Sequence, residues 1–254
     1  MSGRLDGRVA IITGAAGGIG GGAARRFADE GALLTLSDIN GARVEAVAQE
    51  IRDKGGRAIA VPCDIDVPEQ IDAVVDATVQ EYGTVDILAN IAQGGLSEHK
   101  LLEEATAAEV LTSYRTGPLQ SMLFMQRCLP YMKERGYGRV INTASGAAIS
   151  PSPGFSAYAM AKSAVMGLTR VASREWGRYG ITTNTFLPVG RSDGFDLTEQ
   201  GRAAAAQIET ISPVGRFGMP YEDVAPLLVF LASEESGYIN GQAIGADGGI
   251  TFIA

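Results

Sequence analysis

The chain has 254 residues, of which 46% are hydrophobic, enough for one or two domains with a sizeable core. Its net charge of −8, without a stripe of Lys and Arg, argues against nucleic acid as a partner. The sequence shows neither the order of a signal peptide nor an apolar run of the roughly 18 residues that a membrane span needs. We therefore expect a cytoplasmic protein that does not bind membranes.

Two cysteines and one histidine bear on metal binding. Cys63 and Cys128 stand alone in the sequence and form no metal-ligand spacing with each other or with His99. We therefore expect two buried thiols in a reducing compartment, a surface histidine and no metal site.

The N-terminal region predicts a strand, a glycine-rich turn, a helix and a second strand. Residues 9–12 are a short apolar run, typical of a strand buried on both faces of a parallel sheet. Residues 13–20 (TGAAGGIG) form the turn, and apolar residues then recur at helical spacing until Gly31, a C-terminal cap. The second strand, residues 33–37, ends at Asp38.

This unit suits a dinucleotide. Glycines allow the backbone to approach a diphosphate, and the helix N-terminus offers free N–H groups and a positive dipole end. Asp38 lies about 20 residues beyond the glycines, where an acidic side chain can accept hydrogen bonds from both ribose hydroxyls of the adenosine. Its charge would repel a 2′-phosphate, so we expect NAD rather than NADP. The alternative interpretation is an ordinary glycine-rich turn.

Strands and helices continue to alternate to the end of the chain, which predicts crossover connections and a mostly parallel sheet. There is no linker, repeat or low-complexity segment, so residues 1–254 are expected to form one domain. Further strands are predicted at 58–61, 85–89, 138–143, 181–187 and 242–245, and further helices at 41–54, 67–81, 101–115, 118–135, 158–178 and 221–232.

The ends of these strands locate the expected ligand site. Ligands of such sheets bind beyond the C-terminal strand ends, near the point where the strand order reverses. We expect one crevice lined by the residues at those ends: Thr13, Gly14, Asp38, Asp64, Asn90, Ser145 and Pro188.

Residues 145–162 contain three side chains that can act together in proton transfer. Tyr158 and Lys162 are four residues apart, so a helix places them on one face, one turn from each other. A cation at that position favours the phenolate and would lower the pKa of Tyr158. Ser145 adds a hydroxyl donor. The spacing alone is a weak signal, because most such pairs are solvated residues on a helix face.

Taken together, the motifs resemble those of the short-chain dehydrogenase/reductase family, over nearly the whole chain. Thr13-Gly14-x-x-x-Gly18-x-Gly20 is similar to the family's cofactor fingerprint. Ser145, Tyr158 and Lys162 have the spacing of its catalytic residues. Other matching segments are Asp64-Ile65, Asn90 with Ala92, Asn184 to Pro188, Gly215 to Gly218 and Asp247 to Gly249.

The resemblance implies an α/β, Rossmann-like, doubly wound and mostly parallel seven-stranded sheet with helices on both faces. It also implies hydride transfer between a nicotinamide and a carbonyl or alcohol carbon. Tyr158 would be the general acid/base, Lys162 would lower its pKa and bind the nicotinamide ribose, and Ser145 would hold the substrate oxygen. The expected cofactor contacts are Gly14, Ala16, Gly18, Ile19, Gly20, Asp38, Ile39, Asp64, Ile65, Asn90, Ala92, Tyr158, Lys162, Pro188, Val189 and Arg191.

The sequence departs from the family pattern at four positions around the expected active site. Gln93 stands where the family usually has a glycine close to the cofactor. Tyr114 stands where it usually has a catalytic asparagine, whose backbone helps hold a water in the proton relay. Val189 replaces a glycine, and Asp193 replaces a threonine. Two interpretations are open: an active enzyme with a modified pocket and relay, or a nicotinamide-binding subunit with weak or no catalysis.

The substrate is indicated mainly by composition. Family members use the segment at 190–212 as a mobile lid, and here it mixes glycines with apolar side chains. We expect a small, mainly apolar secondary alcohol or ketone. The opposite wall of the substrate site is expected from Gln93, Tyr114, Ala147, Ile149 and Phe155, with Ser145 at the reacting oxygen.

Two further expectations concern partners. A 3-oxoacyl carrier-protein reductase is an alternative within the family, although Asp38 and the acidic balance speak against it. Relatives commonly form tetramers through two long helices, so a homotetramer is expected through 118–135 and 158–178. These helices carry apolar residues beyond one stripe, which could instead pack inside one chain: Met122, Met125, Met166 and Leu168.

Overall fold

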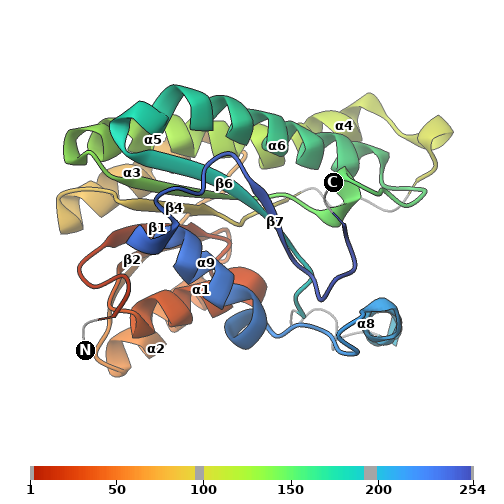
Figure 1. Ribbon diagram of the computed structural model, residues 1–254, viewed down its shortest axis with the longest axis horizontal. Coiled ribbons are helices and arrows are strands. Elements are labelled where there is room, and N and C mark those ends of the chain that lie inside the picture. Colours follow the sequence, from red (N-terminus) through yellow and green to blue (C-terminus); the bar gives the residue numbers. More distant parts are fainter. Residues whose placement is uncertain (1–2, 95–99, 192–198, 253–254) are drawn as a thin grey trace.

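A computed structural model shows a parallel β-sheet between two layers of helices (Figure 1). The structure describes residues 3–94, 100–191 and 199–252. The strand order is β3-β2-β1-β4-β5-β6-β7, which confirms the predicted seven-stranded parallel sheet and reverses between β1 and β4. The strands are β1 (Val9–Thr13), β2 (Leu33–Asp38), β3 (Arg57–Pro62), β4 (Ile87–Asn90), β5 (Gly138–Thr143), β6 (Ile181–Pro188) and β7 (Ala243–Ala246).

The helices cover both faces of this sheet. Figure 1 shows α3, α5 and α6 over one face, and α1, α2 and α9 over the other. The helices are α1 (Gly18–Asp29), α2 (Gly41–Asp53), α3 (Pro68–Tyr82), α4 (Ala107–Tyr114), α5 (Gln120–Arg135), α6 (Ser156–Trp176), α8 (Glu199–Ile211) and α9 (Ala225–Ala232).

Strand β1 is apolar from Val9 to Ile12 because both of its faces are covered. In β1, Ala10 and Ile12 join the cluster beneath α1, α2 and α9, whereas Ile11 between them joins the cluster on the other face. Successive side chains of a strand point to opposite faces, so each face receives alternate residues. This explains why the sequence shows a continuous apolar run rather than an alternation.

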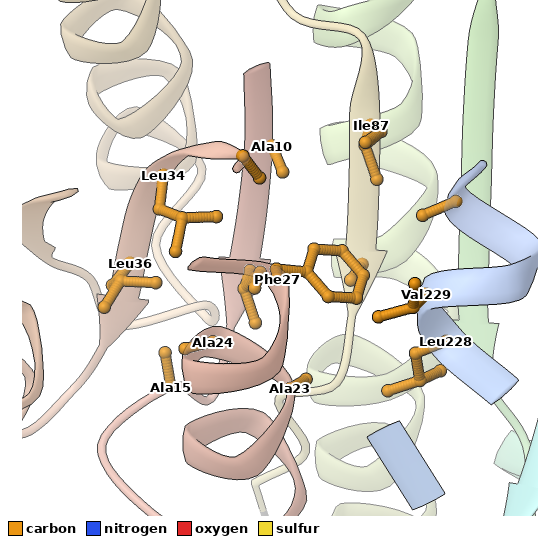
Figure 2. Close-up of a cluster of buried hydrophobic side chains, with 14 of the residues drawn as sticks. Ala10, Ala15, Ala23, Ala24, Phe27, Leu34, Leu36, Ile87, Leu228 and Val229 are labelled. Atoms are coloured by element: carbon orange, nitrogen blue, oxygen red, sulfur yellow. The ribbon is translucent and has the colours of Figure 1, made fainter. Parts of the chain in front are cut away.

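Phe27 is at the centre of the cluster around the first βαβ unit. It projects from α1, and its ring lies beside Ile87 of β4 and near Val229 of α9 (Figure 2). Its side chain is fully buried. The cluster therefore fixes α1, and with it the glycine-rich turn, against the sheet.

The region between β4 and β5 differs from the predicted pair of separate helices. The first helix begins at Ala107 rather than at 101, because Thr106 and Glu109 form a capping box there. The Thr106 hydroxyl accepts from the Glu109 amide at 3.3 Å, and the Glu109 carboxylate accepts from the Thr106 amide at 2.9 Å. A π-helical turn, Arg115–Leu119, then joins α4 to α5 without a break.

Two differences concern the C-terminal third. The segment predicted as a lid contains a helix, α8, that the sequence reading missed. The predicted helix at 221–232 is a π-helical turn, Pro220–Val224, followed by the shorter α9. Ser192, Asp193 and the apolar residues predicted for the lid at 195 and 197 lie outside the described residues, as does His99.

Two of the apolar residues assigned to a subunit interface pack inside the chain. Met125 and Met166 are both buried, on α5 and α6 respectively. In the described ranges no helix has the length and apolar character needed to cross a membrane.

Candidate active site

The glycine-rich turn between β1 and α1 depends on two close approaches of the backbone. Gly14 has φ +69°, and a Cβ there would lie 3.0 Å from the backbone of Ala92. A Cβ on Gly20 would lie 2.1 Å from the Gly14 carbonyl oxygen. Only glycine satisfies both positions without movement of the backbone. The turn therefore packs directly against the loop after β4.

Thr13 connects the two sides of the switch point. Its hydroxyl oxygen accepts hydrogen bonds from the amides of Ile91 and Ala92, each at 3.0 Å. These contacts fix the loop after β4 against the end of β1. The threonine that precedes the glycines therefore shapes the crevice between β1 and β4.

Asp38 faces the same turn from the end of β2. One carboxylate oxygen accepts from the Ala16 amide at 3.1 Å, and the other accepts from the Asn40 amide at 2.9 Å. The next side chain, Ile39, is 73% exposed. An acidic group and an exposed apolar side chain thus border the turn on one side.

The start of α1 fits the phosphates of a dinucleotide. Its N-cap residue, Gly17, makes no side-chain capping bond, and the first turn carries no acidic side chain. Its first N–H groups therefore have no competing side-chain acceptor. With Asp38 alongside, the residues present fit the diphosphate and ribose of a nicotinamide dinucleotide.

Ser145, Tyr158 and Lys162 meet beyond the ends of β5 and β6. Ser145 follows β5, while Tyr158 and Lys162 are one turn apart on α6, as the spacing predicts. The Lys162 ammonium nitrogen donates to the Thr143 carbonyl at 2.8 Å and lies 5.6 Å from the Tyr158 ring centroid. Its side chain is only 2% exposed, and β5 thus holds it from one side.

Burial governs the protonation of this group. Burial lowers the pKa of Lys162 to about 7, because a charged amine loses its hydration there. Burial also raises the pKa of Tyr158, while a hydrogen bond with Ser145 opposes that rise. The lowering of the Tyr158 pKa that the spacing to Lys162 predicts is therefore not found, because desolvation raises this pKa instead. The effect of desolvation on the phenol exceeds any effect of the neighbouring amine.

These three side chains open into a cavity of about 570 Å³. Phe155 packs edge-on to Tyr158 with ring centroids 6.2 Å apart, and apolar residues form most of the remaining wall. Lys100 and Glu109 also line it and form an ion pair at 2.6 Å. The arrangement can hold a mainly apolar molecule with one oxygen at Ser145 and Tyr158.

Comparison with known proteins identifies the family. The family model described as "Enoyl-(Acyl carrier protein) reductase" matches residues 14–251. The chain belongs to the short-chain dehydrogenase/reductase family. It is an oxidoreductase of that family, whose members bind a nicotinamide cofactor.

Relatives of this dehydrogenase/reductase differ in their named substrates. The 3-oxoacyl-[acyl-carrier-protein] reductase FabG of Thermotoga maritima is 34% identical, and the alignment covers 97% of this chain and 99% of that protein. D-threitol dehydrogenase of Mycolicibacterium smegmatis is also 34% identical, with coverages of 98% and 94%. A solved 7α-hydroxysteroid dehydrogenase, in complex with NADH and 7-oxo glycochenodeoxycholic acid, has a TM-score of 0.90, 31% identity and coverages of 98% and 96%.

The cavity brings together only part of the predicted site. Of the predicted residues, those that line it are Ile19, Gln93, Ser145, Phe155, Tyr158, Lys162, Pro188 and Val189. Another group lies in or just after the glycine-rich turn and the ends of β2, β3 and β4: Gly14, Ala16, Gly18, Gly20, Asp38, Ile39, Asp64, Ile65, Asn90 and Ala92. The residues predicted to line one crevice therefore lie along the C-terminal ends of the strands, and the cavity lies at one side of them.

Tyr114, predicted at the substrate, does not line this cavity. Its side chain is 49% exposed, whereas the adjacent Ser113 is buried and lines the cavity. Ala147 and Ile149, assigned to the same wall, also do not line it. Arg191, expected at the cofactor, lies 3.6 Å from the Glu209 carboxylate.

Several lining residues were missed by sequence reasoning. They include Lys100, Glu109, Ser113 and Phe217, whereas Ile208, which also lines the cavity, belongs to the segment predicted as a lid. A local signal existed for Glu109, since Thr106-x-x-Glu109 has the pattern of a capping box. In the described ranges we find no group of three His, Cys, Asp or Glu side chains that could hold a metal ion.

Proposed function

We propose that the protein is an NAD(H)-dependent oxidoreductase that interconverts a secondary alcohol and a ketone, with Tyr158 as general acid/base. The observation that carries the proposal is the convergence of Ser145, Tyr158 and Lys162 on a mainly apolar cavity. This cavity adjoins the strand ends that carry the glycine-rich turn, so a nicotinamide can lie between the turn and the substrate.

Each of the three residues has a role that follows from its surroundings. The bound nicotinamide supplies or accepts the hydride. Tyr158 gives its proton to the carbonyl oxygen in reduction, for which its raised pKa is suitable because the phenol is protonated at neutral pH. Ser145 hydrogen-bonds the substrate oxygen where negative charge develops. Lys162, with a pKa of about 7, can exchange a proton near neutral pH.

The preference for NAD rests on Asp38. Its carboxylate is anchored by the Ala16 and Asn40 amides, so it cannot easily turn away from the adenosine side of the turn. A 2′-phosphate at that place would face a fixed negative charge. We therefore propose NAD, with NADP as the weaker cofactor.

The substrate class follows from the cavity wall. Phe155, Ile208 and Phe217 give it apolar surface, and its volume of about 570 Å³ is suited to a small alicyclic or aromatic alcohol or ketone. The similarity to a threitol dehydrogenase makes polyols the class that must be tested against this proposal.

A 3-oxoacyl carrier-protein reductase is a second candidate, favoured by the 34% identity to such an enzyme of Thermotoga maritima. That reaction requires docking of an acidic carrier, which a chain of net charge −8 would repel in general. Efficient reduction of a carrier-bound β-ketoacyl thioester, with NADPH preferred, would establish this alternative.

The third candidate is a nicotinamide-binding subunit with weak or no catalysis. Gln93 and Val189, two departures from the family pattern, do line the cavity. All three proton-transfer residues nevertheless remain, which is why we favour an active enzyme. NAD binding without turnover across a broad panel would favour the subunit.

Assembly and location remain predictions. We propose a cytoplasmic homotetramer on the basis of the family resemblance. The exposed residues of α6 that remain available for contact include Met160 and Val171. Light scattering that shows a monomer would reject the tetramer.

One screen tests the proposed function. Purified protein is mixed with NAD or NADP and a panel of secondary alcohols, polyols and, in the reverse direction, ketones and carrier-bound β-ketoacyl thioesters. We expect NAD-linked turnover that is highest with apolar secondary alcohols or their ketones. A clear preference for polyols would contradict the substrate class, and absence of turnover throughout would contradict the proposed activity.

A further inference from the structure

Arg115 connects the turn between α4 and α5 to the loop after β3 (residues 63–67). It is the first residue of the π-helical turn, and its guanidinium contacts the Asp66 carboxylate in that loop. The Nε–H group donates to one carboxylate oxygen at 2.8 Å, and an Nη–H group donates to the other at 3.3 Å. The same Nη atom also donates to the Thr112 hydroxyl of α4 at 3.5 Å. Two parallel hydrogen bonds between guanidinium and carboxylate fix the orientation of both groups as well as their separation.

The loop after β3 is built around Asp64. One oxygen of the Asp64 carboxylate accepts from the Asp66 amide at 3.0 Å. The Asp64 amide donates to the Gln70 side-chain oxygen at 2.7 Å, and its carbonyl accepts from the Val67 amide at 3.0 Å. Because the backbone of Asp66 holds the Asp64 carboxylate, the direction of that carboxylate depends on where Asp66 is held.

This loop lies beside the part of the site that suits the adenosine of a dinucleotide. Cys63, the residue before Asp64, donates its amide to the Asp38 carbonyl at 2.9 Å, so the ends of β2 and β3 are adjacent. The Asp38 carboxylate in turn accepts from the Ala16 amide of the glycine-rich turn at 3.1 Å. Asp38 and Asp64 therefore follow neighbouring strands on the side of the glycine-rich turn where the fold receives an adenosine.

The other end of the contact is fixed near the cavity. Thr116, the residue after Arg115, donates its hydroxyl to the carbonyl of Gly94 in the loop after β4 at 2.9 Å. In the sheet, β2 and β1 lie between β3 and β4, and neighbouring strands are about 4.8 Å apart. The contact between Arg115 and Asp66 therefore spans the strand ends between these two loops, on the face that α3 and α5 cover (Figure 1).

The contribution of this ion pair to stability is expected to be small. The side chains of Arg115 and Asp66 are 46% and 32% exposed, and ion pairs at such exposure add little to the free energy of unfolding. What the pair does fix is the distance between the Asp64 loop and the π-helical turn. The geometry thus favours a role in the shape of the site over a role in holding the fold together.

We propose that Arg115 is a positioning residue for the adenosine end of the cofactor: through Asp66 it holds the Asp64 loop in place against the π-helical turn. Asp64 makes the contact with the cofactor, and Arg115 acts through it. The placement of the adenosine beside Asp38 and Asp64 belongs to the proposed function, on which this inference rests.

The first test measures the Kd of the whole protein for NAD and for AMP, the adenosine half of NAD, by calorimetry. For Arg115→Gln we expect both dissociation constants to rise by the same factor, about fivefold, because the loss falls on the adenosine end. The melting temperature should change little, since the pair is half exposed. A rise of less than about twofold in both constants would overturn the proposal.

Asp66→Asn separates position from charge. If Arg115 only attracted the cofactor's phosphates, loss of the nearby carboxylate would tighten NAD binding, because less negative charge would face the diphosphate. If Asp66 has to be held by Arg115, the same substitution should weaken NAD binding about threefold, and adding Arg115→Gln should weaken it little further, since both changes break one link. Tighter binding by Asp66→Asn would overturn the proposal, and so would fully additive losses in the double variant.

Arg127→Gln is the matched control. Arg127 of α5 also pairs with carboxylates of another element, with Asp72 at 2.8 Å and with Asp76 at 2.9 Å, both on α3. Its side chain is 43% exposed, close to that of Arg115. These contacts join two helices along their length and involve no residue of the loop after β3, so we expect wild-type affinity for NAD. A loss equal to that of Arg115→Gln would overturn the specific role of Arg115.

The kinetic signature is a split between KM and kcat. Arg115 does not line the cavity, so in Arg115→Gln the KM for NAD should rise with the Kd while kcat at saturating NAD stays within about twofold of wild type. A fall in kcat with an unchanged KM would overturn the proposal. Protein that binds NAD but turns over no substrate would contradict the proposed activity instead, and the binding measurements would still decide the role of Arg115.

Discussion

Two regions of the molecule are stabilised in opposite ways: the region around the first βαβ unit, here called the nucleotide half, and the region around the cavity, here called the substrate half. Around the first βαβ unit, Phe27 and its neighbours are fully buried apolar side chains in a tight cluster. Around the cavity, Lys162 is just as buried, but it is an amine whose charge loses its hydration. The first half illustrates packing that stabilises the fold, and the second illustrates a group that is kept buried for chemistry at a cost in stability.

The strongest test of this contrast is Lys162→Met. Burial places the folded-state pKa near 7, below the usual 10.5 of a lysine, so the unfolded state binds more protons between these values. Stability of the wild type should therefore rise with pH from about 7 to 10.5. Burial of the charged amine lowers the free energy of unfolding of the wild type, and the substitution removes this loss. The loss should be largest below pH 7, up to about 5 kcal/mol, and should vanish near pH 10.5.

Urea denaturation at pH 6, 8 and 10 measures this effect. We expect Lys162→Met to be more stable than wild type at pH 6 and similar to it at pH 10. Lys54→Met, which alters an exposed lysine of the nucleotide half, serves as the control and should give no such gain. A destabilised Lys162→Met at pH 6 would contradict the account.

The matching change in the nucleotide half is Phe27→Ala. Loss of a fully buried ring leaves a cavity between α1, the sheet and α9, so the free energy of unfolding should fall by about 4 kcal/mol at any pH. Denaturant melts measure it. A loss below about 1 kcal/mol would show that the cluster can collapse around the missing ring.

Ser145→Ala should affect chemistry rather than stability. Removal of the hydroxyl takes away a donor to the substrate oxygen, and turnover should fall by about 10²–10³-fold. The melting temperature should change little, because the substitution removes only the contacts of one hydroxyl, with the Ala147 amide at 3.2 Å and with Tyr158, and leaves the apolar clusters intact. Steady-state kinetics and a thermal melt together provide the measurement, and unchanged turnover would remove Ser145 from the site.

The smallest predicted effect concerns cofactor choice. Asp38→Asn keeps an acceptor for the Ala16 amide but removes the charge. The ratio of kcat/KM for NAD to that for NADP should fall by about tenfold, equivalent to ~1.4 kcal/mol. An unchanged ratio would show that the charge of Asp38 does not set the preference.

The same two halves differ in how far the sequence predicts them. The glycine turn, Asp38 and the alternating elements are local patterns, each spanning a few residues, and they led to the observed sheet. Helix α4 is less predictable: a local capping box, Thr106 to Glu109, does mark its start, but no such pattern marks its end, where a π-helical turn continues into α5. One residue along a helix is a rotation of about 100°, which is why Ser113 lines the cavity and Tyr114 points outward.

The protonation states of Tyr158 and Lys162 also could not be predicted from their spacing in the sequence. The distance between Tyr158 and Lys162 along the helix predicts an attraction between a cation and a phenolate. Whether the amine is charged depends on its burial beside the end of β5, which only the folded chain shows. Likewise, Gln93 and Thr116 are far apart in the sequence, and no local pattern indicates that the Gln93 amide donates to the Thr116 hydroxyl.

The central claim, proton transfer by Tyr158 during hydride transfer, is tested most directly by Tyr158→Phe. Turnover is followed by the absorbance of reduced nicotinamide, with the best substrate of the screen, and NAD binding is measured by calorimetry on the same preparation. We expect turnover to fall by about 10²–10⁴-fold with NAD affinity changed only a few-fold. Turnover equal to that of the wild type would contradict the account.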